Sequence, residues 1–294
     1  MEVGWVILLQ LTLSKTIPLL LAAMGGLLSE RSGVINIVLE GTMLAGAFGS
    51  VAGASLTGSP WLGLLFGILA GCLLGLFHAI SAIRYRADQI VSGTAVNLLA
   101  VGGTGFLLHI LFGSHGSSAN APKLPSLTMG SIVAYPTTLL AVLALIVLSI
   151  MLTRTSWGLR LRAAGERPGA LLGAGIDVRQ IRYIAVVAGA GLAGAAGAHL
   201  ALADLSQFVE RMTAGRGFIA LAALIFGKWQ PRGILLACLF FGGAEALADG
   251  FQGFGSQIPS QVLLAMPFVL TLIVLAGFVG SSRAPSALGR PLES

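Results

Sequence analysis

The sequence predicts an all-α membrane protein, a polytopic bundle of about 8 to 10 spanning helices. Three observations support this fold class. Of the 294 residues, 56% are hydrophobic and only 10% are charged, whereas a soluble domain carries about 25% charged residues. Apolar runs of about 20 residues recur along the chain, which is the length of a spanning helix. The 41 glycines are typical of membrane helices that pack closely together.

Nine apolar segments can be drawn, and they cover approximately residues 4–28, 33–56, 61–83, 89–112, 131–152, 182–203, 216–229, 231–250 and 259–280. Segment 216–229 is short for a full span, which predicts a half-helix. Segment 33–56 is interrupted by glycine and polar residues, so we expect a broken or tilted helix. The first segment follows no basic region and precedes no cleavage site, which favours a first span over a signal peptide.

Basic residues predict the orientation of the chain, because lysine and arginine collect on the cytoplasmic side of a membrane. The long gap 153–182 is therefore cytoplasmic; it carries Arg154, Arg160, Arg162, Arg167, Arg179 and Arg182. Arg84 and Arg86 place the gap 84–88 on the same side. The gap 113–130 is nearly free of basic residues and is expected outside. Nine crossings then leave the N-terminus outside, in a multi-pass protein of the plasma (inner) membrane.

Two parts of the sequence resemble each other. "EGTMLAGAF…SPWLGLLFGILAGCLLG" parallels "GRGFIALAAL…QPRGILLACLFFGG", because each has a glycine-led short helix, a proline turn and a glycine-rich span. The orientation above makes the two copies enter from opposite sides, which predicts an inverted repeat with broken half-helices. The alternative is that helices rich in glycine, leucine and alanine resemble each other by composition alone.

The third segment carries glycines at every fourth position, namely Gly63, Gly67, Gly71 and Gly75. This spacing places them on one helix face, where a second helix can approach closely. We expect this face to pack inside the bundle, with a contact between subunits as the secondary interpretation.

Several classes of function are disfavoured by the sequence. It contains no HExxH, no GxSxG and no paired cysteines, and its four histidines lack ligand spacing, so no catalytic or metal site is predicted. The "GKW" at 227–229 lacks the remainder of a phosphate-binding loop. No chain of intramembrane carboxylates indicates a proton relay. Basic residues lie in short gaps, which is typical of membrane loops and not of a nucleic-acid interface.

The gap 153–182 has the character of ordered structure. Pro168 suits a first helical turn and Gly175 a position just past a helix end, so a short helix is predicted from about Pro168 to Gly173. A compact helix on the cytoplasmic surface could be pushed by a soluble motor domain. A simple basic interfacial loop is the alternative.

Three stretches resemble a known family. "GLRLRAAGERPGALLGAGIDV" is similar to the coupling loop of permeases in ATP-binding-cassette importers for branched-chain amino acids, sugars and nucleosides. "SERSGVINIVLEGTMLAGAF" and "FVERMTAGRGFIALAALIFGKWQPRG" resemble the nucleoside-type branch, which works with basic-membrane-protein-type binding lipoproteins. The matches extend from about residue 18 to residue 250 and so cover most of the chain.

The resemblance implies a single transmembrane permease domain, 1–294, with 153–182 as its cytoplasmic coupling loop. It implies two nucleotide-binding ATPase partners that hold ATP and Mg, a second permease that is more often a paralogue than a second copy, and an external solute-binding protein. The chain itself would be no enzyme and hold no cofactor. The residues expected to couple to the ATPase are Arg162, Ala163, Gly165, Glu166, Arg167, Gly175 and Ile176.

Polar residues within apolar segments mark the expected substrate path. Asn36 and Glu40 are four residues apart and would share one helix face, which should avoid lipid because polar groups are costly there. They could line the path or form a hydrogen-bonded pair that pins a broken helix. Asn97 could contact the solute or bond another helix. The full set is Asn36, Glu40, Ser92, Thr94, Asn97 and Thr104.

These amides and hydroxyls offer no strong counter-charge, which favours a neutral polar cargo, namely a nucleoside. A sugar, a flavin or a branched-chain amino acid remains open within the importer class. An ATP-independent secondary transporter or facilitator is the rival from another class, and an intramembrane enzyme lacks a catalytic pair. Lys15 lies unexpectedly within the first segment; it could snorkel, or pair with Glu40 or Glu245.

Overall fold

The computed structural model describes residues 2–129, 132–253, 269 and 283–292, and nearly all of its regular structure is helical. This confirms the all-α prediction, apart from a two-stranded antiparallel hairpin in which Leu127 pairs with Ala134. The helices are α1 (Glu2–Arg31), α2 (Leu39–Thr57), α3 (Pro60–Ala79), α4 (Gln89–Phe112), α5 (Pro136–Arg154), α6 (Ser156–Glu166), α7 (Pro168–Gly173), α8 (Val178–Ala198), α9 (Arg216–Phe226) and α10 (Pro231–Gly253). Two π-helical turns, η1 (Ile80–Arg84) and η2 (His199–Leu205), extend α3 and α8; the strands are β1 (Leu127–Met129) and β2 (Ile132–Ala134).

Six helical stretches of the described residues are long and apolar enough to cross a membrane. They are Trp5–Arg31, Pro60–Arg84, Gln89–Phe112, Pro136–Arg154, Val178–Leu205 and Pro231–Gly250. The fourth starts later than the sequence indicated, because β2 occupies the beginning of segment 131–152. Helix α9 has 11 residues, fewer than a span needs. Segment 259–280 lies outside the described residues.

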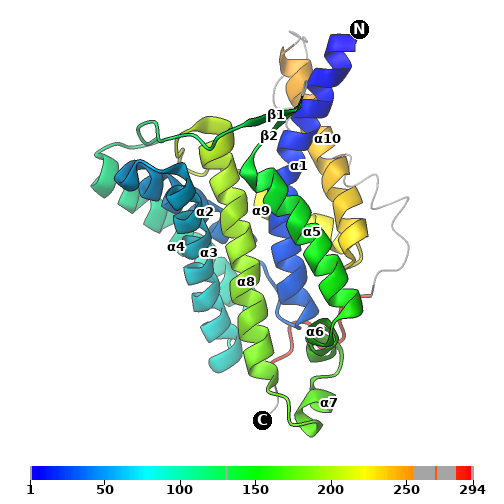
Figure 1. Ribbon diagram of the computed structural model, residues 1–294. Helices are drawn as coiled ribbons and strands as arrows, with labels where there is room; N and C mark the ends of the chain where they lie inside the picture. Colours follow the sequence, from blue (N-terminus) through cyan, green and yellow to red (C-terminus); the bar gives the residue numbers. More distant parts are fainter. Residues whose placement is uncertain (1, 130–131, 254–268, 270–282, 293–294) are drawn as a thin grey trace.

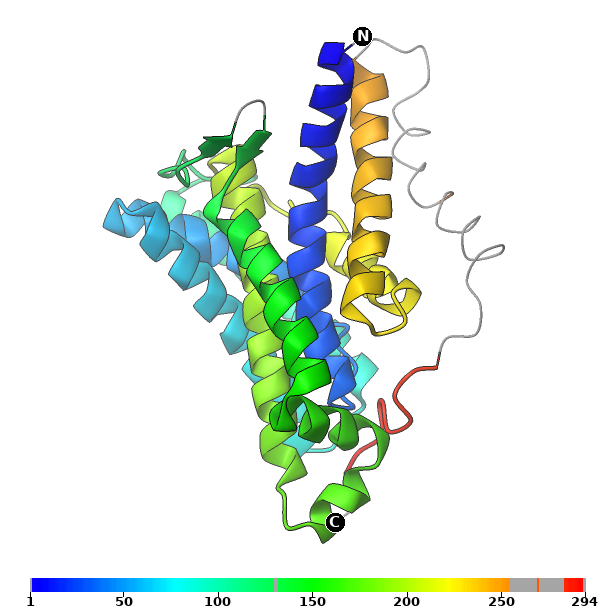
Figure 2. The ribbon, with the colours of Figure 1, turned by 45° about the vertical axis from the view of Figure 1, so that its right-hand side comes forward.

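The two ends of the bundle carry different parts of the chain. Figure 1 shows the N-terminus and the β1–β2 hairpin at one end, and α6, α7 and the C-terminal residues at the other. Helices α1 and α10 lie side by side, and α2, α3 and α4 form the opposite flank (Figure 2). This arrangement agrees with the orientation that the basic residues predict, in which 153–182 and the N-terminus lie on opposite sides.

The centre of the bundle is packed through small residues. All four glycines at 63, 67, 71 and 75 are buried, and a methyl group on Gly71 would collide with Ala190 and Gly194 of α8. On Gly67 it would lie 2.8 Å from the Gly46 carbonyl oxygen of α2. The prediction that this stripe packs inside the bundle is confirmed, because α3 lies against α2 and α8 almost backbone to backbone.

Glycine and proline end the helices where the sequence indicated. Gly33 has φ +95° two residues after α1 ends, and this left-handed conformation suits a residue without a Cβ. Helix α7 spans Pro168–Gly173 as predicted, and Gly175 follows it with φ +73°. The segment 32–38 is irregular, so α2 begins only at Leu39.

Candidate functional site

Asn97, in the first half of α4, forms hydrogen bonds to the backbone at the start of α2. The side-chain Oδ1 accepts a hydrogen bond from the Gly41 N–H at 2.8 Å, and Nδ2 donates to the Ile37 carbonyl at 2.9 Å. A Cβ at residue 41 would lie 2.7 Å from the same Oδ1. Asn97 therefore satisfies the Gly41 N–H, which the first turn of α2 leaves unpaired, and holds the Ile37 carbonyl in the segment before α2. This is the interhelical role weighed for it above.

Glu40 in turn caps the start of α9. Its carboxylate accepts hydrogen bonds from the Thr213 hydroxyl at 2.6 Å, the Gly215 N–H at 2.9 Å and the Gly217 N–H at 2.7 Å. A negative charge is favourable at this position because the N-terminus of a helix carries partial positive charge. Glu40 thus joins the start of α2 to the start of α9, two segments far apart in the sequence.

The expectation that Asn36 and Glu40 share a helix face is wrong, because α2 begins after Asn36. Asn36 lies in the irregular segment and is buried, with 1% of its surface exposed. Its Nδ2 has no hydrogen-bond partner among the described residues. Since Glu40 is engaged with α9, the two side chains do not form the pair that the spacing suggested. Asn36 remains a buried amide with unused donor capacity.

The other expected path residues, all on α4, are placed differently from one another. Thr104 is buried and donates to the Ala100 carbonyl at 2.7 Å. Ser92 Oγ lies 3.3 Å from Nδ1 of His78. Thr94 is exposed on the outer side of the helix and donates to the Ile90 carbonyl at 2.9 Å. The structure therefore gathers Asn36, Glu40 and Asn97 around the start of α2, whereas Thr94 points away from that cluster.

A cavity of about 400 Å³ opens beside the last turns of α4. It is lined by Val101, Gly102, Thr104, Gly105, Phe106, His109, His115, Glu210 and Arg211. The rings of His109 and His115 are stacked with their centroids 4.4 Å apart. The sequence interpretation missed this site, because Glu210 and Arg211 come from the loop before α9 and no local spacing links them to α4.

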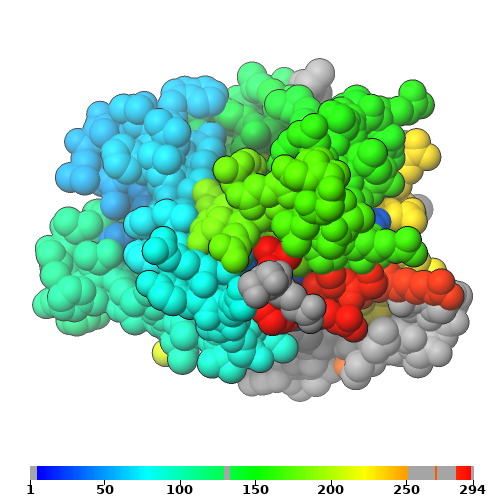
Figure 3. All heavy atoms as spheres, turned by 90° about the horizontal axis from the view of Figure 1, so that it is seen from below, coloured from blue at the N-terminus to red at the C-terminus, as the bar shows by residue number. Residues whose placement is uncertain are grey.

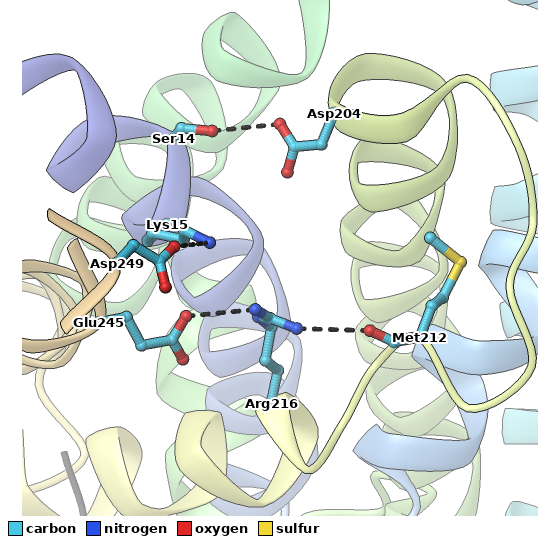
Figure 4. A network of polar contacts seen from close by, with 7 residues as sticks. All are labelled: Ser14, Lys15, Asp204, Met212, Arg216, Glu245 and Asp249. Carbon is cyan, nitrogen blue, oxygen red and sulfur yellow. Dashed lines mark hydrogen bonds and ion pairs between the residues drawn. The ribbon is translucent and has the colours of Figure 1, made fainter. Parts of the chain in front are cut away.

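A second polar cluster joins α1, α9 and α10 inside the bundle (Figure 4). Lys15 Nζ lies 2.6 Å from the Asp249 carboxylate, and Arg216 Nη2 lies 3.4 Å from that of Glu245. The expected partners of Lys15, Glu40 or Glu245, are therefore wrong. Glu245 and Asp249 are four residues apart on one helix face, a signal that the sequence interpretation did not use.

The same cluster continues toward η2. Ser14 donates to Asp204 Oδ1 at 3.1 Å (Figure 4), and His199 Nε2 lies 3.7 Å from the same oxygen. Lys15–Asp249 and Arg216–Glu245 are thus opposite-charge pairs on neighbouring helices, which limits the desolvation cost of these four groups. Across the parts of the chain that the structure describes, no three histidine, cysteine, aspartate or glutamate side chains are arranged to hold a metal ion.

At the end of the bundle opposite the β1–β2 hairpin, α6 and α7 form the surface of the 153–182 loop. Glu166 and Arg167 are exposed, Arg162, Ala163 and Ile176 are half-buried, Gly165 is buried and Gly175 is exposed. Any side chain at residue 165 would collide with the Arg31 carbonyl. Gly165 therefore positions the loop against the end of α1 and presents no contact surface of its own.

Residues 283–292 lie directly against this loop, a contact that no sequence pattern indicated. The Ala287 N–H donates to the Gly165 carbonyl at 2.8 Å, and the Ser286 hydroxyl donates to the Glu166 carbonyl at 2.6 Å. Figure 3 shows these residues, in red, between the green α6–α7 surface and the cyan end of α3. The C-terminal residues are thus part of the surface that carries α6.

Comparison with known proteins defines the class. The family model "Branched-chain amino acid transport system / permease component" matches residues 8–275. The chain therefore belongs to this family of permeases, the non-catalytic membrane subunits of ATP-binding-cassette transporters, and is a multi-pass membrane protein. Such a subunit carries no cofactor of its own and works with ATPase and solute-binding partners.

Individual relatives cover nearly the whole chain. The guanosine ABC transporter permease protein NupQ of Bacillus subtilis is 41% identical over 97% of this chain and 96% of its own length. The nucleoside ABC transporter permease protein NupC of Lactococcus lactis is 41% identical over 92% of each chain. The putative glucose ABC transporter permease protein TsgC13 of Haloferax volcanii is 38% identical over 90% of this chain and 85% of its own.

Paralogous permeases also occur in the family. A second guanosine ABC transporter permease protein of Bacillus subtilis, NupP, is 26% identical over 93% of this chain and 81% of its own length.

Proposed function

We propose that this chain is the membrane permease of an importer that carries nucleosides into the cytoplasm. The observation that carries the proposal is the similarity, at 41% identity over almost the full length, to permeases named for guanosine and nucleosides. The polar groups around the start of α2 support a neutral cargo, because the one carboxylate among them, Glu40, is occupied by α9. A charged solute would need a free counter-charge in the membrane.

The test is uptake by the assembled transporter. The cognate solute-binding protein should bind purine or pyrimidine nucleosides, and proteoliposomes that contain the complex should take them up only with ATP. Glucose is the decisive competitor, because one relative is named for it. Tight binding of glucose, a flavin or a branched-chain amino acid with no response to nucleosides would contradict the cargo and leave the importer class unchanged. Uptake without any ATPase would instead favour a secondary transporter.

The proposed assembly has two permeases, two ATPase subunits that hold ATP and Mg, and an external solute-binding protein at the plasma (inner) membrane. We infer that the second permease is a paralogue, which is supported by the pair NupQ and NupP in one organism. In this proposal the exposed apolar face of α4, with Leu98 and Phe106, meets lipid or the second permease. Thr94 lies on that same outer side.

We propose a substrate path that runs past the start of α2 along α4, with Asn36, Glu40, Ser92, Asn97 and Thr104 along it or at its border. Thr94 is left out of this path because it is exposed on the outer side of α4. Two observations support it: Asn36 has unused donor capacity in a buried position, and Thr104 lines the cavity at the other end of α4. Glu40 and Asn97 act in this path by holding the starts of α9 and α2 in place.

The finer architecture is also a proposal. We infer that α2 and α9 are the half-helices of an inverted repeat, each followed by a proline turn and a glycine-rich helix. The support is the irregular segment before α2, the 11-residue length of α9, and Pro60 and Pro231 at the first turns of α3 and α10. Each half-helix start is capped by a polar side chain from another element, as broken helices in membranes require.

We propose one permease domain, 1–294, in which 153–182 is the loop that the ATPase moves. Helix α6 lies at the end of the bundle (Figure 2). Exposed Glu166 and Arg167, together with half-buried Arg162, make the end of α6 polar. Ala163, Gly165, Gly175 and Ile176 belong to this coupling region because they shape the backbone of α6 and α7.

A further inference from the structure

A basic cavity of about 500 Å³ opens at the end of the bundle that carries α6. Its walls come from the last residues of α1 and α5, from α6, and from the turn between α9 and α10. Four arginines line it: Arg31, Arg154, Arg162 and Arg232. The other lining residues are Ser149, Leu152, Thr153, Trp229, Gln230 and Pro231, so no described residue in the lining is acidic.

One of these guanidinium groups is fixed by the surrounding structure. Arg31 donates to the Trp229 carbonyl from Nε at 3.0 Å and from Nη2 at 2.7 Å. Trp229 is itself buried, and its indole N–H donates to Glu30 at 2.6 Å. Trp229 and the preceding Lys228 both have a left-handed backbone, with φ of 51° and 54°, which costs energy in residues other than glycine. The turn is therefore held in a definite shape that aims its carbonyl at Arg31.

The positive charges form no salt bridge among the described residues, and Glu166 is the carboxylate whose charge acts on Arg31 from nearby. None of the four arginines forms an ion pair there, and Nε of Arg162 is buried without a hydrogen-bond partner. The nearby carboxylates are engaged, because Glu30 accepts from Trp229 and Glu166 Oε2 accepts from the Ser286 hydroxyl at 3.2 Å. Like charges around one cavity repel each other, so an anion bound between them would be stabilising.

Exposed apolar side chains continue from the arginines along the outer surfaces of α5 and α10. Ile150 lies one turn before Arg154 on the same face of α5 and is 54% exposed. Leu236 lies one turn after Arg232 on the same face of α10 and is 68% exposed. A ligand with an anionic head and acyl chains matches both parts of this surface, whereas free phosphate or an acidic protein groove matches only the arginines.

We propose that this cavity binds the phosphate headgroup of an anionic phospholipid from the cytoplasmic leaflet. Basic pockets between membrane helices on the cytoplasmic side suit such headgroups, and guanidinium groups donate two parallel hydrogen bonds to phosphate oxygens. Because the bound headgroup contacts Arg162 of α6 as well as Arg154 and Arg232, it joins the loop to α5 and α10. The proposal deepens the proposed transport function by making it dependent on anionic lipid.

The test compares two charge-matched double variants of the complete transporter complex. R154Q/R232Q removes two charges from the cavity. R84Q/R86Q removes two exposed charges that lie at the same end of the bundle but do not line the cavity. The complexes are placed in phosphatidylcholine nanodiscs, and binding of added phosphatidylglycerol is measured by native mass spectrometry. A basic residue near the surface contributes about fivefold in affinity for anionic lipid, so we expect about 30-fold weaker binding for R154Q/R232Q and little change for R84Q/R86Q.

Three results would overturn the proposal. Equal loss of binding in both variants would indicate attraction by net charge alone. Displacement of phosphatidylglycerol by millimolar inorganic phosphate would make free phosphate the ligand. Retention of lipid by R154Q/R232Q, together with loss of the ATPase subunits from the complex, would assign the arginines to an acidic groove of the ATPase. Nucleoside binding by the solute-binding protein does not depend on any of these three results. A failure of the lipid proposal can therefore be told apart from a failure of the cargo proposal.

Discussion

Nε of Arg182 donates a hydrogen bond to the carbonyl oxygen of Ser32 at 3.0 Å, which joins the first turns of α8 to the segment between α1 and α2. The same guanidinium donates to the carbonyl of Ala164 at 3.4 Å and to that of Arg290 at 3.1 Å. Four parts of the chain therefore meet at one side chain that is only 2% exposed. Arg182 therefore links α6 to the segment that leads from α1 into α2.

Replacing Arg182 with methionine should therefore impair both folding and coupling. The change leaves three carbonyl groups without their donor, at a cost of about 1 to 3 kcal/mol for each buried group. We expect a clearly lower Tm of the purified complex and loss of nucleoside uptake. Arg182→Lys keeps the charge but not the planar fork, so it should be intermediate. Arg179→Met, at an exposed position three residues earlier, is the control and should leave Tm within error.

Removing the Glu40 carboxylate should detach the start of α9. Glu40→Ala deletes three hydrogen bonds, and charge-assisted bonds contribute about 1.5 to 3 kcal/mol each, so Tm should fall strongly. Thr213→Val deletes one of the three donors and should lose roughly a third as much. If Glu40→Ala alters uptake while Tm stays unchanged, the carboxylate contacts the solute and its capping role is minor.

Asn97→Leu tests the same idea at the start of α2. The substitution removes the acceptor for Gly41 and the donor for Ile37, so we expect a loss of about 2 to 4 kcal/mol in stability together with reduced uptake. Thr94→Val, which changes an exposed hydroxyl on the same helix, is the matched control. A stable Asn97→Leu complex with altered nucleoside selectivity would place Asn97 in the solute path and not in the scaffold.

Lys15 and Asp249 should show measurable but modest coupling in a double-mutant cycle. Lys15 Nζ and the Asp249 carboxylate are 2.6 Å apart, and both side chains are only partly buried, at 23% and 43% exposed, so the effects of the two substitutions should not be additive. Lys15→Met and Asp249→Asn should each lower the midpoint of denaturation, and the double variant should lose less than the sum. Strict additivity of the three values would show that the two side chains do not interact.

Charge reversal on α6 should uncouple transport from ATP hydrolysis. The double variant R162E/E166R inverts the proposed ATPase-facing charges, and we expect uptake to disappear while the complex elutes as a folded species. Ser286→Ala tests the contact between α6 and residues 283–292 separately, since it removes the two hydroxyl hydrogen bonds to Glu166 and keeps the Ser286 N–H bond to the Glu166 carboxylate. Survival of both uptake and solute-stimulated ATPase activity in R162E/E166R would refute the assignment.

The sequence predicted regular features well because they depend on local chemistry. The span 89–112 coincides with α4, the short helix Pro168–Gly173 with α7, and the glycine stripe packs as expected, since hydropathy, proline and glycine act within a few residues. The partners of single polar side chains were not predictable. Lys15 binds Asp249 and Glu40 caps α9 because helices distant in sequence meet there. The four-residue spacing of Asn36 and Glu40 wrongly predicted a shared helix face, because α2 starts only at Leu39.

The packing of residues 283–292 against α6 has a consequence for biosynthesis. These residues are synthesised after helices α1 to α10. Helix α6 and the segment 32–35 are therefore made before residues 283–292 can pack against them. Until then the carbonyl groups of Gly165 and Gly33 lack the partners that Ala287 and Gly289 supply. The surface beside α6 is thus complete only after residues 283–292 have been synthesised.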